Sequence, residues 1–316
     1  MKLFTSSVAS LAIALCVGGQ ASATIFSEDF EVDPTANWTV NDSALSDISV
    51  NFNYDYSAIG VPSAPNGAGT SGLKMSANST GGVFSGFSVS PTGQSFSGNY
   101  QVKFDLWQNY VGPVGPGGSG TTQLSFFGVG TSGTEAMWAG AATKESVTFG
   151  VTLDGGSSVD YRIYDSANPT GRTDAASFAG GADRNGSNPY YAVFGGDAAP
   201  VDQVTLYPAQ TGVTDAGEIA FAWREVTIDV IADVATMSID GLPIGIVDMS
   251  ALTLGGGNIL FGHGDTNNGS SSDPNAELLN VTLIDNVQVS QLVPEPSSVL
   301  LSLAAAAGGL FFRKRS

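Results

Sequence analysis

The chain has 316 residues, of which 41 are glycine and 13% are charged, and its formal net charge at pH 7 is −18. Such a surface repels nucleic acid and anionic lipid and attracts cations, so we exclude nucleic acid as a partner. A single cysteine, Cys16, excludes an internal disulfide, and a single histidine, His263, excludes a zinc site built from a histidine–cysteine cluster.

Residues 1–23 have the pattern of a secretory signal peptide. A positive charge precedes a mostly apolar segment, residues 3–17, and Ala21 and Ala23 are the small residues that a cleavage site requires. We therefore expect the secretion machinery to export the chain, and we expect the mature protein to begin at Thr24.

Residues 24–292 form the predicted body, which carries seven basic residues against 28 acidic ones. Short apolar segments alternate with segments rich in glycine, serine, asparagine and aspartate, a pattern typical of strands joined by turns. The length fits one large antiparallel two-sheet sandwich, and the predicted class is all-β. The segments predicted as strands are 24–30, 100–107, 122–129, 147–153, 160–164, 190–194, 225–230, 235–239, 258–261 and 278–289.

Residues 223–245 predict a meander of antiparallel strands. After Trp223, every second residue is apolar on the way to a turn at Ala232 and Asp233, and the return strand ends in a tight turn at Asp240. The residues expected to face inward are Val226, Ile228, Val230, Ala235, Met237 and Ile239.

This meander resembles the corresponding stretch of concanavalin A-like, laminin-G-like jelly rolls. Residues 26–31 and 282–289 resemble the first and last strands of such sandwiches, which pair side by side. The resemblance implies a jelly-roll body in which Trp223 packs against the core.

The same resemblance implies a structural calcium ion, because in many relatives carboxylates from the first and last strands hold one. The matching residues here are Glu28, Asp29 and Asp285, and carboxylate oxygens are the donors that Ca²⁺ prefers. The alternative is that these acids are solvated residues at strand ends.

Carbohydrate binding is the function that a lectin-like sandwich favours. Aromatic rings stack on the apolar face of a sugar, and the candidates for such a platform are Trp107, Tyr110 and Trp138. The alternative for each of them, favoured for any single residue, is a place in the core as an aromatic residue of a strand.

Catalysis finds little support in the sequence. No Gly-x-Ser-x-Gly motif is present, and the acids at 28–31 lack the Glu-x-Asp-x-x-Glu spacing of sandwich glycosidases. His263 lies between two glycines at the end of an apolar segment, where a lone histidine is a loop or core residue more often than a base. We therefore expect no enzymatic activity.

The C-terminal tail, residues 293–316, has three parts. A polar motif precedes an uncharged segment, residues 297–312, whose length as a helix is about 24 Å, a marginal membrane span. Positive charges at its end hold the C-terminus in the cytoplasm. The polar motif is Pro294, Glu295 and Pro296, and the terminal cations are Arg313, Lys314 and Arg315.

This order of parts at the chain end resembles the PEP-CTERM sorting signal of bacterial surface and extracellular proteins. The resemblance implies a single C-terminal apolar helix, a transient membrane anchor, processing by an exosortase, and delivery to the cell surface or extracellular matrix. The sequence thus predicts an exported, non-catalytic protein that binds exopolysaccharide. The alternatives to this predicted function are a structural or adhesive module without a small ligand, and a glycan-active enzyme.

Overall fold

The computed structural model describes residues 22–42, 47–115, 122–171 and 177–292. Nearly all of them belong to one compact unit, Thr24–Gln291, and the second unit comprises residues 1–23 and 292–316. Ala21, the motif at 294–296, the predicted apolar helix and the basic cluster at 313–315 lie outside the described residues. Within the described ranges, no helix has the length and apolar character that a membrane crossing requires.

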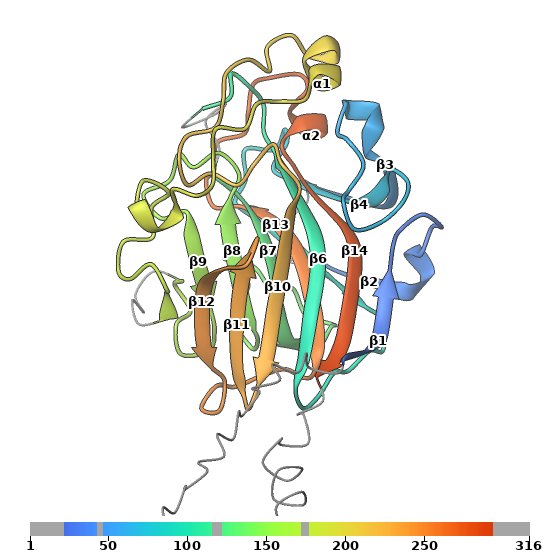
Figure 1. The fold of residues 1–316 in the computed structure, drawn as a ribbon, viewed down its shortest axis with the longest axis vertical. Helices are drawn as coiled ribbons and strands as arrows, with labels where there is room; N and C mark the ends of the chain where they lie inside the picture. The colour runs from blue at the N-terminus through green and yellow to red at the C-terminus, as the bar shows by residue number, and fades with distance from the viewer. Residues whose placement is uncertain (1–21, 43–46, 116–121, 172–176, 293–316) are drawn as a thin grey trace, which may run out of the picture. The chain divides into compact units, whose positions relative to one another are not determined.

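Eight of the described strands form the larger sheet. Seven of them follow one path, in the spatial order β12 (Leu242–Asp248), β11 (Val234–Ile239), β10 (Arg224–Ile231), β6 (Tyr100–Asn109), β14 (Val281–Leu292), β4 (Ser71–Ala77) and β3 (Ile48–Asp55). The eighth, β1 (Ser22–Glu28), pairs with β14, which confirms the expected pairing of the first and last strands (Figure 1). There Gln288 Nε2 donates a hydrogen bond of 2.7 Å to Thr24 Oγ1.

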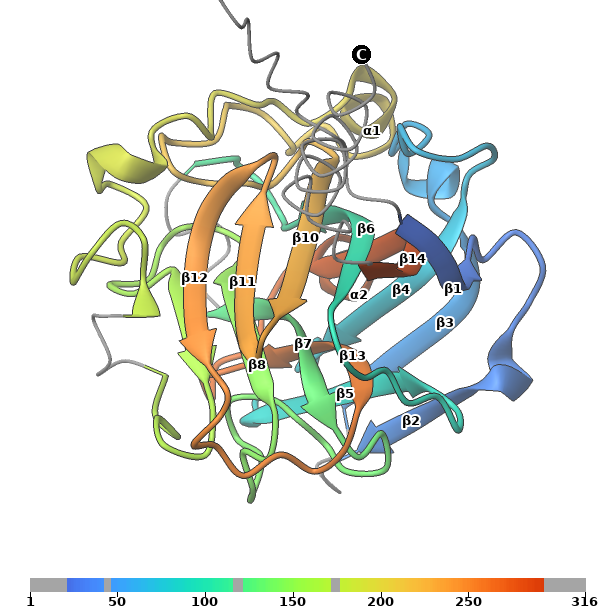
Figure 2. The ribbon, with the colours of Figure 1, turned by 60° about the horizontal axis from the view of Figure 1, so that its bottom comes forward.

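The smaller sheet packs against the inner face of the larger one. Its six strands, in spatial order, are β2 (Trp38–Asp42), β5 (Ser85–Pro91), β13 (Asn258–Asp265), β7 (Gln123–Thr131), β8 (Val147–Thr152) and β9 (Tyr161–Tyr164). Figure 2 shows β10, β11 and β12 in one layer and β5, β7 and β8 in the other. The described body is therefore all-β, with two antiparallel sheets, as predicted.

Helical segments in the described residues are short. They are η1 (Thr35–Asn37), η2 (Tyr56–Ile59), η4 (Pro189–Tyr191), α1 (Val201–Leu206) and α2 (Ala276–Leu279). The strand predicted at 190–194 is therefore wrong, because the segment begins with a 3₁₀ turn. Pro189 cannot donate to a sheet, and the Asn188 side chain accepts the N–H of Tyr190, which caps that turn.

The predicted meander at 223–245 is confirmed. Strands β10 and β11 pair directly, and all six residues expected to face inward are at most 4% exposed. Ala232 and Asp233 have φ values of 49° and 63°, as the tight hairpin turns that match strand twist require. The side chain of Trp223 packs against Tyr56 and Trp107, as expected of a packing residue.

Aromatic rings fill the space between the two sheets around the middle of β6. Phe104 on β6 is 1% exposed, and its ring meets Phe127 on β7 at 5.3 Å and Phe261 on β13 at 4.9 Å, both edge-on. Edge-to-face contacts of this kind stabilise a core beyond the area that they bury. These three residues join both sheets at the centre of the domain.

Near the C-terminal end of β6, the side chains that point into the space between the two sheets are polar. Gln108 Nε2 donates to Ser125 Oγ at 2.8 Å, and Ser125 and Thr282 share a bond of 2.6 Å. His263 bonds Thr282 through Nδ1 and Gln123 Oε1 through Nε2, both at 2.9 Å. Complete burial lowers the pKa of His263 to about 3, so the ring is neutral. His263 is thus a core residue, one of the two places expected for it.

We expect Phe104→Ala to lower the free energy of unfolding by about 3–5 kcal/mol, because it empties space at the junction of both sheets. Urea denaturation measures the change. Ile246→Ala is the control, since Ile246 is 45% exposed and its truncation opens no cavity in the core. A loss for Phe104→Ala no larger than that of the control would contradict the assignment of the core.

Candidate functional site

Three acidic side chains form a row across the outer face of the larger sheet. Asp105 on β6 is the register partner of both Asp285 on β14 and Glu225 on β10. Register partners in antiparallel strands point to the same face, and the adjacent Ile284 and Leu106 point to the core. Asp105 and Asp285 are only 0% and 3% exposed. A buried carboxylate is strongly unfavourable without hydrogen-bond donors, so this row needs partners.

The loop at residues 60–70 and the adjoining η2 supply the donors. Asn66 donates its backbone N–H to Asp105 Oδ2 at 3.2 Å and its side-chain amide to Asp105 Oδ1 at 2.7 Å. The Tyr56 hydroxyl on η2 donates to Asp285 Oδ2 at 3.0 Å. These bonds fix the loop on the outer face of the sheet and hold the Asn66 side chain in one orientation.

A β-bulge in β14 lies beside the row. The register with β6 shifts between Asp285 and Gln288, and Asn286 within the bulge has a φ of 52°. The Asn286 amide donates to Asp105 Oδ2 at 2.8 Å. Gly67 lies so close that a Cβ there would be 1.9 Å from Asn286 Oδ1. β-Bulges change the direction in which side chains point at functional sites. This bulge directs the Asn286 amide, which lies between Asp105 and Gly67.

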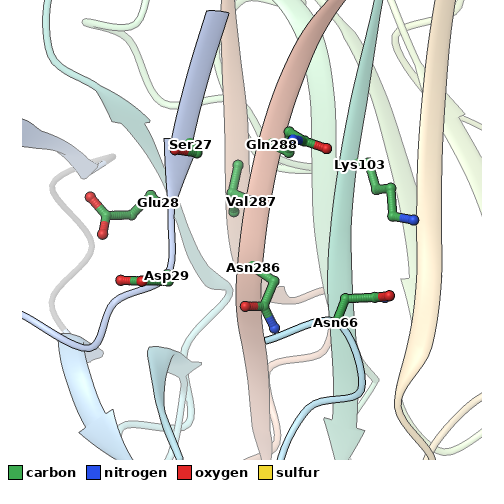
Figure 3. Close-up of a pocket in the computed structure, with 8 residues that line it drawn as sticks. All are labelled: Ser27, Glu28, Asp29, Asn66, Lys103, Asn286, Val287 and Gln288. Carbon is green, nitrogen blue, oxygen red and sulfur yellow. The ribbon is translucent and has the colours of Figure 1, made fainter. Parts of the chain in front are cut away.

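A groove of about 420 Å³ opens between β1, the bulge and the loop (Figure 3). Its lining residues are Ser27, Glu28, Asp29, Asn66, Lys103, Asn286, Val287 and Gln288. In Figure 3 the side chains of Glu28 and Asp29 lie on the side of β1 that faces away from β14. The polar groups that line the groove are amides, a hydroxyl, two carboxylates and one ammonium, a set of donors and acceptors suited to a ligand rich in hydroxyl groups.

The calcium ligands expected from the resemblance do not form a site. Glu28 Oε1 accepts the N–H of Phe30 at 3.0 Å and Asp29 Oδ1 accepts the N–H of Glu31 at 3.2 Å, whereas Asp285 is buried beneath the loop at 60–70. In the part of the chain that the structure describes, no three histidine, cysteine, aspartate or glutamate side chains are placed to share a metal ion. The three carboxylates therefore do not converge on one ion in the described residues.

The aromatic residues proposed as sugar platforms are packing residues. Trp107 and Trp138 are each 1% exposed and Tyr110 is 3% exposed. Trp107 packs against the ring of Trp223, and Trp138 lies under Phe84 at 4.9 Å. A buried ring has no face for a sugar to stack on, so the structure assigns these three side chains to packing.

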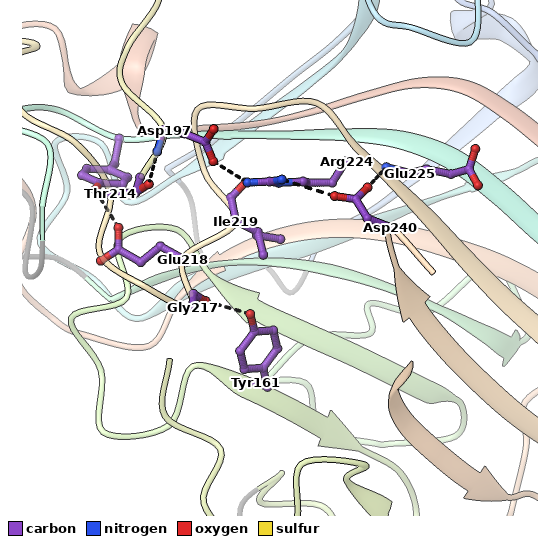
Figure 4. A network of polar contacts seen from close by, with 10 residues as sticks. Tyr161, Asp197, Thr214, Gly217, Glu218, Ile219, Arg224, Glu225 and Asp240 are labelled. Atoms are coloured by element: carbon purple, nitrogen blue, oxygen red, sulfur yellow. Dashed lines mark hydrogen bonds and ion pairs between the residues drawn. The ribbon is translucent and has the colours of Figure 1, made fainter. Parts of the chain in front are cut away.

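A second polar centre, built around Arg224, ties loops to the end of β10 (Figure 4). Its guanidinium donates to the Ile219 carbonyl at 3.1 Å and forms ion pairs with Asp197 and Asp240. It also lies over the ring of Phe194 at 5.5 Å. Only 13% of the Arg224 side chain is exposed, so this centre joins three connections and offers little surface to a ligand.

Among the buried carboxyl groups with raised pKa values, Asp285 and Glu218 have the largest shifts. Burial, together with the charges of Asp105 and Glu31, raises the pKa of Asp285 to about 7. Burial raises the pKa of Glu218 to about 8, although the Tyr110 hydroxyl donates to Glu218 Oε2 at 3.1 Å. Both groups bind protons more tightly in the folded state than in the unfolded state, which links folding to pH.

No protein-family model matches the sequence, and no curated protein does. Among solved structures, the chain is similar to a Bacillus subtilis protein of unknown function with a galectin-like fold, with 11% identity and a TM-score of 0.45, over 88% of this chain and 99% of that one. An endo-1,3-beta-glucanase from Streptomyces sioyaensis has 14% identity and a TM-score of 0.45, over 89% and 100%.

The carbohydrate recognition domain of Emp46p in its potassium-bound form has 11% identity and a TM-score of 0.40, over 82% of this chain and 91% of that one. Identities and scores this low assign no activity, ligand or metal to the chain. The site therefore has to be interpreted from its own residues.

We expect the free energy of unfolding to fall as pH rises from 5 to 9. The stability that protonated Asp285 and Glu218 contribute is fully present below their unfolded-state pKa values and is lost as pH rises through about 7 and about 8. Each unit of pKa shift corresponds to about 1.4 kcal/mol. Urea denaturation at several pH values measures the slope.

The variant Asp285→Asn/Glu218→Gln should flatten this dependence, because its amides do not titrate. Asp202→Asn/Asp233→Asn removes the same number of charges at exposed positions and should keep the slope of the unaltered protein. If the free energy of unfolding has the same slope against pH in both double variants, Asp285 and Glu218 are not the source of the pH dependence.

Proposed function

We propose that this protein is exported, reaches the cell surface or extracellular matrix, and binds polysaccharide there without cleaving it. The observation that carries the proposal is the groove beside β1, which Asn66, Asn286 and Gln288 line. Two of these amides are held by Asp105, so they are ordered before a ligand arrives. Ordered donors and acceptors favour affinity because less conformational entropy is lost on binding.

A non-catalytic role is supported by the hydrogen bonds of the two buried acids beside the groove, Asp105 and Asp285. Both oxygens of Asp105 accept amide hydrogens, and those of Asp285 accept the Tyr56 hydroxyl and the N–H of Asn286. A glycosidase needs one carboxyl free to donate a proton and another free to act as a base or nucleophile. Here the buried acids orient side chains of the groove instead.

Binding is tested by titrating the purified, exported protein with soluble polysaccharides and fitting the dissociation constant. The variant Asn286→Gly/Gln288→Ala removes two amides, and glycine keeps the positive φ that the bulge needs. We expect its affinity to fall at least tenfold. Gln94→Ala, which removes an exposed amide elsewhere, should leave affinity unchanged. Equal affinities for the groove variant and the unaltered protein would place the ligand elsewhere.

The route to the surface is proposed from the two terminal segments. Cleavage before Thr24 would retain five of the seven residues of β1, and processing by an exosortase would act on the motif at 294–296. Until then, the apolar segment at 297–312 would anchor the protein in the membrane.

We expect deletion of residues 300–316 to move the protein from the membrane fraction to the soluble fraction, because it removes most of the apolar segment. Immunoblots of fractionated cells measure the distribution. Pro294→Ala/Pro296→Ala alters only the polar motif, so this control should stay in the membrane fraction. If the deletion leaves the distribution unchanged, the tail is not the anchor.

A further inference from the structure

One positively charged side chain lines the groove, and an ion pair neutralises its charge. Lys103 is the only cationic residue among those that line it, and its Nζ forms an ion pair with Glu225 Oε2. The two side chains are 32% and 40% exposed, so the pair lies at the rim, open to solvent. Surface pairs of this kind contribute little to stability, which makes a structural explanation of this pair weak.

Glu225 does not line the groove, yet it is placed to control it. Its carboxylate also accepts the Asn66 side-chain amide at 3.4 Å, and its backbone N–H is fixed by Asp240 Oδ1 at 2.9 Å. The other acid beside Lys103 on the same face of β6 is Asp105, whose oxygens are taken by amides. Glu225 is therefore the acid that neutralises Lys103.

We propose that Glu225 is a positioning residue that makes the groove selective for neutral, hydroxyl-rich glycans over glycans that carry carboxylates. The inference rests on the proposed function. With Lys103 paired, the groove offers amides, a hydroxyl and the carboxylates of Glu28 and Asp29 to a ligand, and it has no free cation for a uronic acid. The acidic body, with 28 acids against seven basic residues, adds a general repulsion of anionic chains.

The experiment compares a neutral oligosaccharide with a uronic-acid oligosaccharide of equal length, by isothermal titration at 150 mM salt on the purified, exported protein. The unaltered protein should bind the neutral oligosaccharide at least tenfold more tightly. In Glu225→Gln the amide can still accept from Asn66, but Lys103 is released. Affinity for the uronic-acid oligosaccharide should then rise about tenfold, and the rise should shrink as salt increases.

Asp229→Asn is the matched control, because Asp229 lies on the same strand and the substitution removes the same charge. Asp229 pairs with Gln101, outside the groove. The double variant Glu225→Gln/Lys103→Met should lose the gain, since the released ammonium is gone. An equal gain for Asp229→Asn and Glu225→Gln would reduce the effect to net charge and overturn the inference. Failure of the unaltered protein to bind either oligosaccharide would overturn the proposed function instead.

Discussion

The site depends on the burial of one carboxylate, Asp105, in the middle of the larger sheet. A carboxylate that is 0% exposed must have its oxygens bonded, and those donors come from two places. One is Asn66 in the loop that crosses the outer face, and the other is Asn286 in the bulge of β14. The same requirement therefore positions the loop, stabilises the bulge and orders two amides of the groove.

The side chains between the two sheets change from aromatic to polar along the strands. Around the middle of β6 the two sheets contact each other through phenylalanine rings. Near the C-terminal end of β6 they contact each other through His263, Thr282 and Ser125. Because Gln123 Oε1 can only accept, His263 must carry its proton on Nε2, and Thr282 must donate to Nδ1. Each bond in the chain then has one direction. Polar cores of this kind favour one alignment of the sheets over a shifted one.

Aromatic and β-branched content predicted the fully buried β7 and β8, and alternation predicted the strands that have one face in the core and one in water. The hairpin of β10 and β11 is of this kind, and its turn residues identify it independently. Strand β5 was missed because only Phe87 and Val89 among its seven residues are aromatic or β-branched, although all seven are buried. Its small residues have a packing reason, since a Cβ on Gly86 would lie 2.3 Å from the Trp138 ring. The 3₁₀ turn at Tyr190 was missed because aromatic content outweighed the signal from Pro189.

The site was less predictable than the fold. Asp105, Glu225 and Asp285 are far apart in the chain, and only the register of β6 with its two neighbours places them side by side. Asn66 acts through a loop whose course no periodic pattern indicates. The aromatic candidates failed for the opposite reason, because residues such as Trp107 serve a core as well as a binding surface, and composition does not separate these uses.

The pairing of β1 with β14 has a consequence for the order of folding. Thr24 and Gln288, which touch across these strands, are 264 residues apart in sequence. The larger sheet therefore gains β1 only after the last strand of the body has been made, and a contact of such long range forms slowly. Until β1 pairs with it, the part of β14 that contains Gln288 has an open edge, where unpaired backbone groups invite pairing with other chains.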